Sequence, residues 1–172
     1  MKRSARVALG GVIAALSIVL LLLGYIPAAS MICPILAGFL LMLVYLHADM
    51  KTAVLVFITA SVISFPTCDI TVVLLYVLFF GYYPLLKSRL ERIRFRPAEW
   101  ILKLLTFNAG AAVYYLVLQY VLGIPMNISL FGIRSIWVLL IAANLVFLLY
   151  DRALSIFITR YKQTFFRRVG KF

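Results

Sequence analysis

The chain consists of long apolar runs separated by short polar segments. The runs cover residues 7–26, 28–47, 52–65, 70–86, 100–122 and 133–157. A helix that crosses a bilayer needs about 20 apolar residues, so this pattern predicts six transmembrane helices. The runs are unbroken, whereas the strands of a membrane barrel alternate polar and apolar positions. We therefore expect an all-α integral membrane protein in which residues 1–172 form a single six-helix transmembrane domain.

Turn residues and run lengths refine this prediction. Pro27 and Pro66 are expected in the outer turns, and Gly123 with Pro125 ends the fifth run. The third run, residues 52–65, would rise only about 21 Å as a helix, against a hydrocarbon core of about 30 Å. We expect this helix to borrow residues from its flanks, to tilt within the bundle or to thin the bilayer locally.

Composition agrees with a membrane location. Hydrophobic residues make up 66% of the 172 residues and charged residues 13%. Soluble domains contain about 45–50% apolar and about 25% charged residues. A soluble fold of this size could not cover so much apolar surface.

The charge distribution predicts the topology. The chain has 17 Lys and Arg against 5 Asp and Glu, a net charge of +12. If the N-terminus is cytoplasmic, Arg134 is the one basic residue on the outer side. Because basic loops stay in the cytoplasm, we expect both termini there, in the plasma (inner) membrane. Basic loops at a membrane favour anionic lipid over nucleic acid as the partner.

Two basic cytoplasmic segments have a character of their own. Residues 87–99 carry basic residues interleaved with Leu90 and Ile93, the pattern of an interfacial helix. Residues 158–172 form a basic cytoplasmic tail that mixes aromatic and cationic side chains. Either segment serves orientation and lipid contact, or it is a docking surface for a partner.

Catalytic motifs are missing from the sequence. It contains no Walker loop, no HExxH and no GxSxG, and His47 is its single histidine. Cys33 and Cys68 lack metal-type spacing. We therefore expect no catalytic residue, no metal site, no cofactor and no enzymatic activity.

Neutral polar residues in the last two runs and the outer loop between them suggest a binding site. Those on one helical face or near the outside would line an outward pocket for a small molecule. For each one alone, interhelical glue is the favoured explanation. Arg134 is explained equally as a carboxylate or phosphate contact or as an interface anchor. The predicted substrate-binding residues are Tyr115, Gln119, Asn127, Arg134, Trp137 and Asn144.

The first run carries two overlapping pairs of small residues. Gly10 and Ala14 form one pair, and Gly11 and Ala15 form the other. Small residues four positions apart allow another helix to approach closely. They are the candidate partner-docking face, although the pattern alone is common in membrane helices.

The segment RVALGGVIAALSIVLLLLGYIP, with six expected helices in under 180 residues, resembles the substrate-binding membrane subunit (S component) of energy-coupling-factor (ECF) transporters. The resemblance covers the whole chain in topology and about the first 40 residues in motif. It implies that the small-residue face docks on a transmembrane coupling subunit driven by separate ATPase subunits. It also implies an outward-facing pocket for a vitamin-like substrate. Metal-specific members have a His-rich N-terminus that this chain lacks, so nickel and cobalt are disfavoured.

A second hypothesis is a non-catalytic multi-helix membrane scaffold of a cell-envelope complex, similar in size to the rod-shape-determining membrane protein. A transporter subunit needs a ligand-sized outward cavity with polar groups. A scaffold could fill the same space with packed Leu and Phe side chains.

Overall fold

The computed structural model describes residues 3–91, 96–123 and 136–169. Its helices are α1 (Arg3–Leu23), α2 (Ile32–His47), α3 (Met50–Thr67), α4 (Ile70–Leu75), α5 (Tyr83–Leu90), α6 (Arg96–Leu116) and α7 (Ile136–Val169), with π-helical turns η1 (Tyr76–Phe80) and η2 (Val117–Val121). The chain divides into two compact units, an N-terminal unit of residues 1–126 and a C-terminal unit of residues 127–172. Each unit is described by itself.

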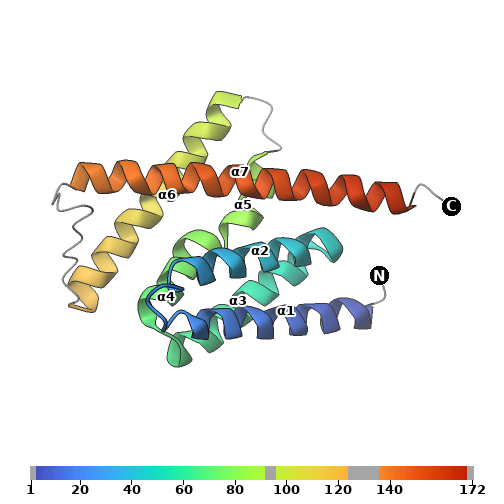
Figure 1. The fold of residues 1–172 in the computed structure, drawn as a ribbon, viewed down its shortest axis with the longest axis horizontal. Helices are drawn as coiled ribbons and strands as arrows, with labels where there is room; N and C mark the ends of the chain where they lie inside the picture. Colours follow the sequence, from blue (N-terminus) through green and yellow to red (C-terminus); the bar gives the residue numbers. More distant parts are fainter. Residues whose placement is uncertain (1–2, 92–95, 124–135, 170–172) are drawn as a thin grey trace. The chain divides into compact units, whose positions relative to one another are not determined.

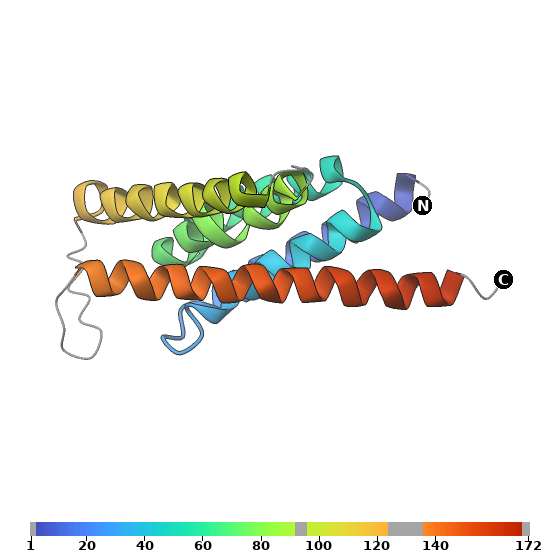
Figure 2. The same ribbon diagram turned by 90° about the horizontal axis from the view of Figure 1, so that it is seen from above.

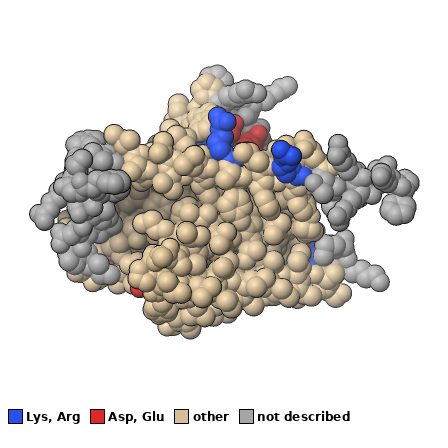
Figure 3. Space-filling view, viewed as in Figure 1, with Lys and Arg blue, Asp and Glu red and all other residues tan. Residues whose placement is uncertain are grey.

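The expectation of an all-helical chain is confirmed over the described residues. Five helical stretches in them are long and apolar enough to cross a membrane: Ser4–Leu23, Met50–Thr67, Ile70–Leu90, Pro97–Val121 and Leu140–Tyr161. The face in Figure 3 agrees with this composition, since uncharged residues cover nearly all of its described area and charged side chains lie near its edges.

The second helix is shorter than the sequence predicts. The apolar run begins at residue 28, but α2 begins at Ile32 and has 16 residues. The residues before it form successive turns, with Ala29 N donating to Ile26 O and Ser30 Oγ donating to Pro27 O over 2.9 Å. Because these groups find partners within the turn, the helix starts one turn later.

The third helix, in contrast, gains residues at both ends. Asp49 caps α3 by accepting a hydrogen bond from Thr52 N at 2.7 Å, so the helix begins at Met50 and reaches 18 residues. Of the three expectations for the short run, the structure shows the first: α3 extends into the flanking residues. Pro66 lies inside the last turn of α3, not in the turn that follows. A proline can sit there because its fixed φ is helical and only one backbone hydrogen bond is lost.

Helices α1 and α3 pack side by side and run parallel (Figure 1). Arg6 at the start of α1 donates to Asp49 before α3 over 2.9 Å. Tyr25 just after α1 donates to the carbonyl of Thr67 at the end of α3 over 3.3 Å. The two helices therefore stay in one register along their whole length.

Two buried apolar clusters form the core of the N-terminal unit. The first joins α1, α2, α3 and α5 and includes Ile13, Leu41 and Val56. The second joins α1, α2, α3, α4 and η1 and includes Leu21 and Tyr76. Burying such side chains fully contributes about 1.5–3 kcal/mol each against water, and in lipid their close packing holds the helices together.

Helix α6 packs against the π-helical turn η1. Phe79 of η1 contacts the rings of Phe107 and Tyr114, with centroids 5.1 and 5.8 Å apart. Gly110 lies at the closest approach, since a Cβ there would stand 2.8 Å from the carbonyl oxygen of Leu78. The aromatic contacts hold α6 against η1, and because Gly110 has no side chain, the two backbones can lie close together.

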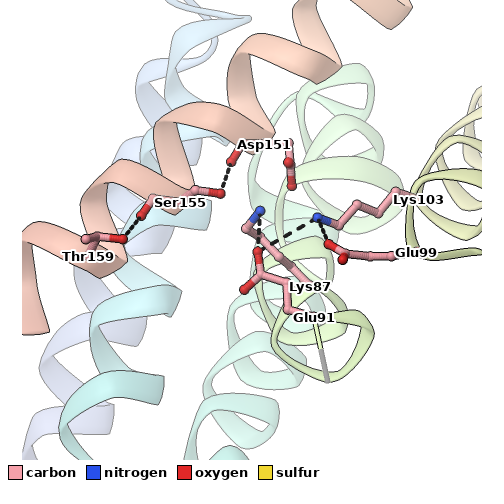
Figure 4. Close-up of polar contacts among 7 residues, drawn as sticks. All are labelled: Lys87, Glu91, Glu99, Lys103, Asp151, Ser155 and Thr159. Atoms are coloured by element: carbon pink, nitrogen blue, oxygen red, sulfur yellow. Dashed lines mark hydrogen bonds and ion pairs between the residues drawn. The ribbon is translucent and has the colours of Figure 1, made fainter. Parts of the chain in front are cut away.

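The C-terminal unit contains one continuous helix, α7, of 34 residues (Figure 2). The apolar run predicts a helix ending near residue 157, but α7 continues through the basic segment to Val169. Its hydroxyls bond within the helix, with Ser155 Oγ donating to Asp151 O and Thr159 Oγ1 to Ser155 O (Figure 4).

Candidate functional site

The small residues of α1 divide between two faces of the helix. Gly10 and Ala14 are buried against α3: a Cβ on Gly10 would stand 3.3 Å from Val56, and Ala14 belongs to the first core cluster. Gly11 and Ala15 are exposed. Successive residues of an α-helix point about 100° apart, so the two overlapping pairs cannot share one face. Of the four candidate docking residues, Gly11 and Ala15 are the two that a partner can reach in this structure.

Large apolar side chains surround the exposed pair. Val7, Val12 and Val19 are 68%, 58% and 53% exposed on the same helix. A Cβ on Gly11 would meet no atom within 4 Å. From Val7 onward the exposed surface of α1 is therefore apolar, and Gly11 and Ala15 lie on it one helical turn apart.

The predicted substrate-binding residues of the N-terminal unit are both exposed. Tyr115 lies in the last turn of α6 and is 37% exposed, and Gln119 lies in η2. The π-helical turn was not predicted from the sequence, and it alters the spacing that places positions 115 and 119 on one face of an α-helix. Turns of this kind occur frequently at functional sites.

The other four predicted substrate contacts belong to the C-terminal unit. Asn127 and Arg134 lie outside the described residues, and so does the side chain of Trp137, whose backbone is in α7. Asn144 lies in α7, where its amide donates to the carbonyl of Leu140 over 2.8 Å. This bond shows how an amide within an apolar helix satisfies one of its donors locally.

Four charged residues form a cluster that joins the end of α5 to the start of α6 (Figure 4). Lys87 Nζ lies 2.9 Å from Glu91 Oε1, and Lys103 Nζ lies 2.6 Å from Glu99 Oε1 and 3.8 Å from Glu91 Oε1. Both lysines are buried, at 0% and 2% exposed. Because carboxylates hold both ammonium groups, each buried charge is compensated.

This cluster changes the interpretation of the basic segment 87–99. Lys87 lies in α5, Glu91 follows its end, and α6 begins at Arg96. Within the described residues, the segment therefore consists of the ends of two helices. The sequence contained the signal for the ion pairs, since Lys87 and Glu91, and again Glu99 and Lys103, stand four apart. Only the fold shows that Glu91 also pairs with Lys103.

The ends of α1 and α3 carry a second ion pair. The side-chain and backbone hydrogen bonds of Thr52, together with Arg6, hold the pKa of Asp49 below its usual 3.8. Arg6 and Asp49 are 40% and 39% exposed. This pair marks the end of the bundle at which α1 begins.

Within the described residues, His, Cys, Asp and Glu do not gather in groups of three or more that could hold a metal ion. Cys33 and Cys68 are free and buried. Comparison with protein families, with curated proteins and with solved structures found no match to the chain.

Proposed function

We propose that the chain is the substrate-binding membrane subunit of an ECF-type uptake transporter. It binds a small, vitamin-like molecule from outside and docks on a transmembrane coupling subunit driven by separate ATPases. In this proposal six helices cross the plasma membrane, α2 being the shortest, and both termini are cytoplasmic. The chain itself carries out no catalysis, so the energy for uptake comes from its partners.

The observation that carries this proposal is the exposed pair Gly11 and Ala15 on α1. Helices in lipid associate by van der Waals packing, because lipid tails solvate an apolar side chain as well as a protein does. Two small side chains one turn apart let a partner backbone approach closely and gain many contacts. The pair is exposed although Gly10 and Ala14, its neighbours in sequence, are buried by α3. Close approach of a partner helix would give the exposed pair a role.

Tyr115 and Gln119 remain the proposed substrate contacts of the N-terminal unit. Both are exposed polar side chains at the end of α6 and in η2. If α1 begins on the cytoplasmic side, as proposed, and six helices alternate across the membrane, this end of α6 would face the outside. Substrate and coupling subunit would then bind at different helices.

The test is to fill the exposed pair without disturbing the core. Gly11→Leu and Ala15→Leu add bulk at exposed positions of α1, and a Cβ on Gly11 meets no atom of the described residues within 4 Å, so both variants are expected to fold like the wild type. Each is expected to lose co-purification with a co-expressed coupling subunit and its ATPases, and to lose uptake. Ala112→Leu is the matched control, because Ala112 is an exposed alanine on α6.

Two results would contradict the proposal. Retained coupling and uptake in both α1 variants would show that the pair is not the docking face. Failure of the wild-type chain to bind any coupling subunit, with recovery of cell-envelope proteins instead, would favour the scaffold hypothesis.

A further inference from the structure

Three buried hydroxyl groups of the N-terminal unit make no hydrogen bond to any described residue. They belong to Ser17 on α1, Ser64 on α3 and Tyr76 in η1, and each of the three residues is 0% exposed. Buried polar groups almost always have a hydrogen-bond partner, and inside an apolar bundle an unpaired group is costly. Three such groups in one compact unit point to a partner from outside the chain.

The two serines differ from the other helical hydroxyls. Ser61 Oγ donates to the carbonyl of Phe57 and Thr67 Oγ1 to that of Ile63, each over 2.8 Å. This bond to the preceding turn is the ordinary way for a helical hydroxyl to be satisfied. Ser17 and Ser64 do not make it. Their hydroxyls therefore remain available to another group.

The register of α1 and α3 places the two serines about one helical turn apart along the bundle. Arg6 pairs with Asp49 and Tyr25 with Thr67, separations of 43 and 42 positions along the chain. The same offset places Ser17 level with Ala60. Ser64 is one helical turn further along α3, roughly 6 Å along the axis.

Tyr76 belongs to the third element, η1, and lies in the buried core of the same unit. Its ring lies 5.7 Å from that of Phe57 on α3, between centroids, and it belongs to the same buried cluster as Ala60 and Ala37. A tyrosine carries its hydroxyl well away from its own backbone. Ala37 and Ala60 are the smallest members of this cluster. The three hydroxyls thus belong to α1, α3 and η1, three elements that contribute side chains to one buried cluster.

The chemistry of these surroundings defines the ligand. A hydroxyl can donate one hydrogen bond and accept two, so the three groups suit a partner that both donates and accepts. Every residue of the surrounding cluster is uncharged, and burying a charge there would be prohibitively costly. We propose that Ser17, Ser64 and Tyr76 bind an uncharged hydrogen-bonding ligand inside the N-terminal unit, either a trapped water or a small neutral molecule bearing hydroxyl or carbonyl groups.

The test removes one hydroxyl at a time from the purified full-length chain. In Ser17→Ala, Ser64→Ala and Tyr76→Phe, the melting temperature is expected to fall by about 2–4 °C each, the shift for losing one hydrogen bond in a chain of this size. The double variant Ser17→Ala with Tyr76→Phe should lose less than the sum, because both side chains bind one ligand. Ser61→Ala is the matched control on α3. It removes only a local bond to a carbonyl of the preceding turn, and the higher helix propensity of alanine offsets that loss, so the melting temperature is expected to stay nearly unchanged.

An unchanged or raised melting temperature in the three variants would overturn the proposal. Removing a hydroxyl that truly lacks a partner relieves its desolvation cost and leaves the fold as stable or more stable. Native mass spectrometry of the wild type and of Tyr76→Phe then separates the two sources. A retained small molecule that the variant loses identifies the ligand, and melting losses without such a mass identify water.

Discussion

Adding one methyl group at Gly24 should loosen the contact between α1 and α4. Gly24 follows the end of α1 and is buried. A Cβ there would stand 2.6 Å from Cγ1 of Val72 and 2.9 Å from the carbonyl oxygen of Leu21. Carbon atoms in contact prefer about 3.5–4.0 Å, so the methyl group requires a shift of about 1 Å. Val72 is 1% exposed and β-branched, so its side chain has little freedom to move.

These distances set the magnitude for Gly24→Ala. Overpacking a well-packed core costs about 1–3 kcal/mol. The lower entropy of alanine in the unfolded chain offsets about 0.4–1 kcal/mol of this. The net loss of about 1–2 kcal/mol corresponds to a fall in melting temperature of about 2–8 °C. Gly11→Ala is the control on the same helix: its methyl group meets nothing within 4 Å, and the gain in helix propensity of about 0.8–1 kcal/mol should raise the melting temperature by about 2–4 °C.

The protein supplies its own probe for this measurement. Its two cysteines, Cys33 and Cys68, are 5% and 6% exposed, so a thiol-reactive fluorogenic dye reports unfolding. The double variant Gly24→Ala with Val72→Ala should lose less than the sum of the two single losses, because the second change makes room for the first. If Gly24→Ala melts at or above the wild-type temperature, α1 does not end against Val72 and the described packing is wrong.

Two further predictions concern one end of the bundle and the topology. Asp49→Ala should lower the melting temperature at pH 7, because the carboxylate caps α3. Since its pKa is held below 3.8, its contribution is present above that pH and is lost as the pH falls through the folded value. The difference in melting temperature between Asp49→Ala and the wild type should therefore shrink below about pH 4. A difference that stays constant from pH 7 to pH 3 would contradict this. For the topology, once both native cysteines are replaced, a cysteine at Ser30 should react with a membrane-impermeant reagent in intact cells and one at Ser88 should not; labelling at Ser88 would overturn cytoplasmic termini.

The sequence by itself determined the class of protein and the approximate position of its helices. Apolar runs of this length form helices wherever water is scarce, because every backbone group must be paired within its own segment. Extension of the run at 52–65 was one of three expected outcomes, and Asp49, a strong N-cap residue, is the signal in the sequence that could have singled it out. The boundaries that shifted, such as the start of α2 at Ile32, depend on turn hydrogen bonds that hydrophobicity does not record.

Only the tertiary structure decided which face of each helix lies inside. In a soluble protein a polar face marks the outside, but lipid and core are both apolar, so α1 carries no such mark. Gly10 and Gly11 are equivalent in the sequence, and packing against Val56 buries the first and leaves the second exposed. The sequence likewise does not show that the hydroxyls of Ser17 and Tyr76 are buried without a partner. Their surroundings come from helices that are distant in the chain. Pairing between elements is a property of the folded bundle, and it determined both the exposed pair on α1 and the buried hydroxyls.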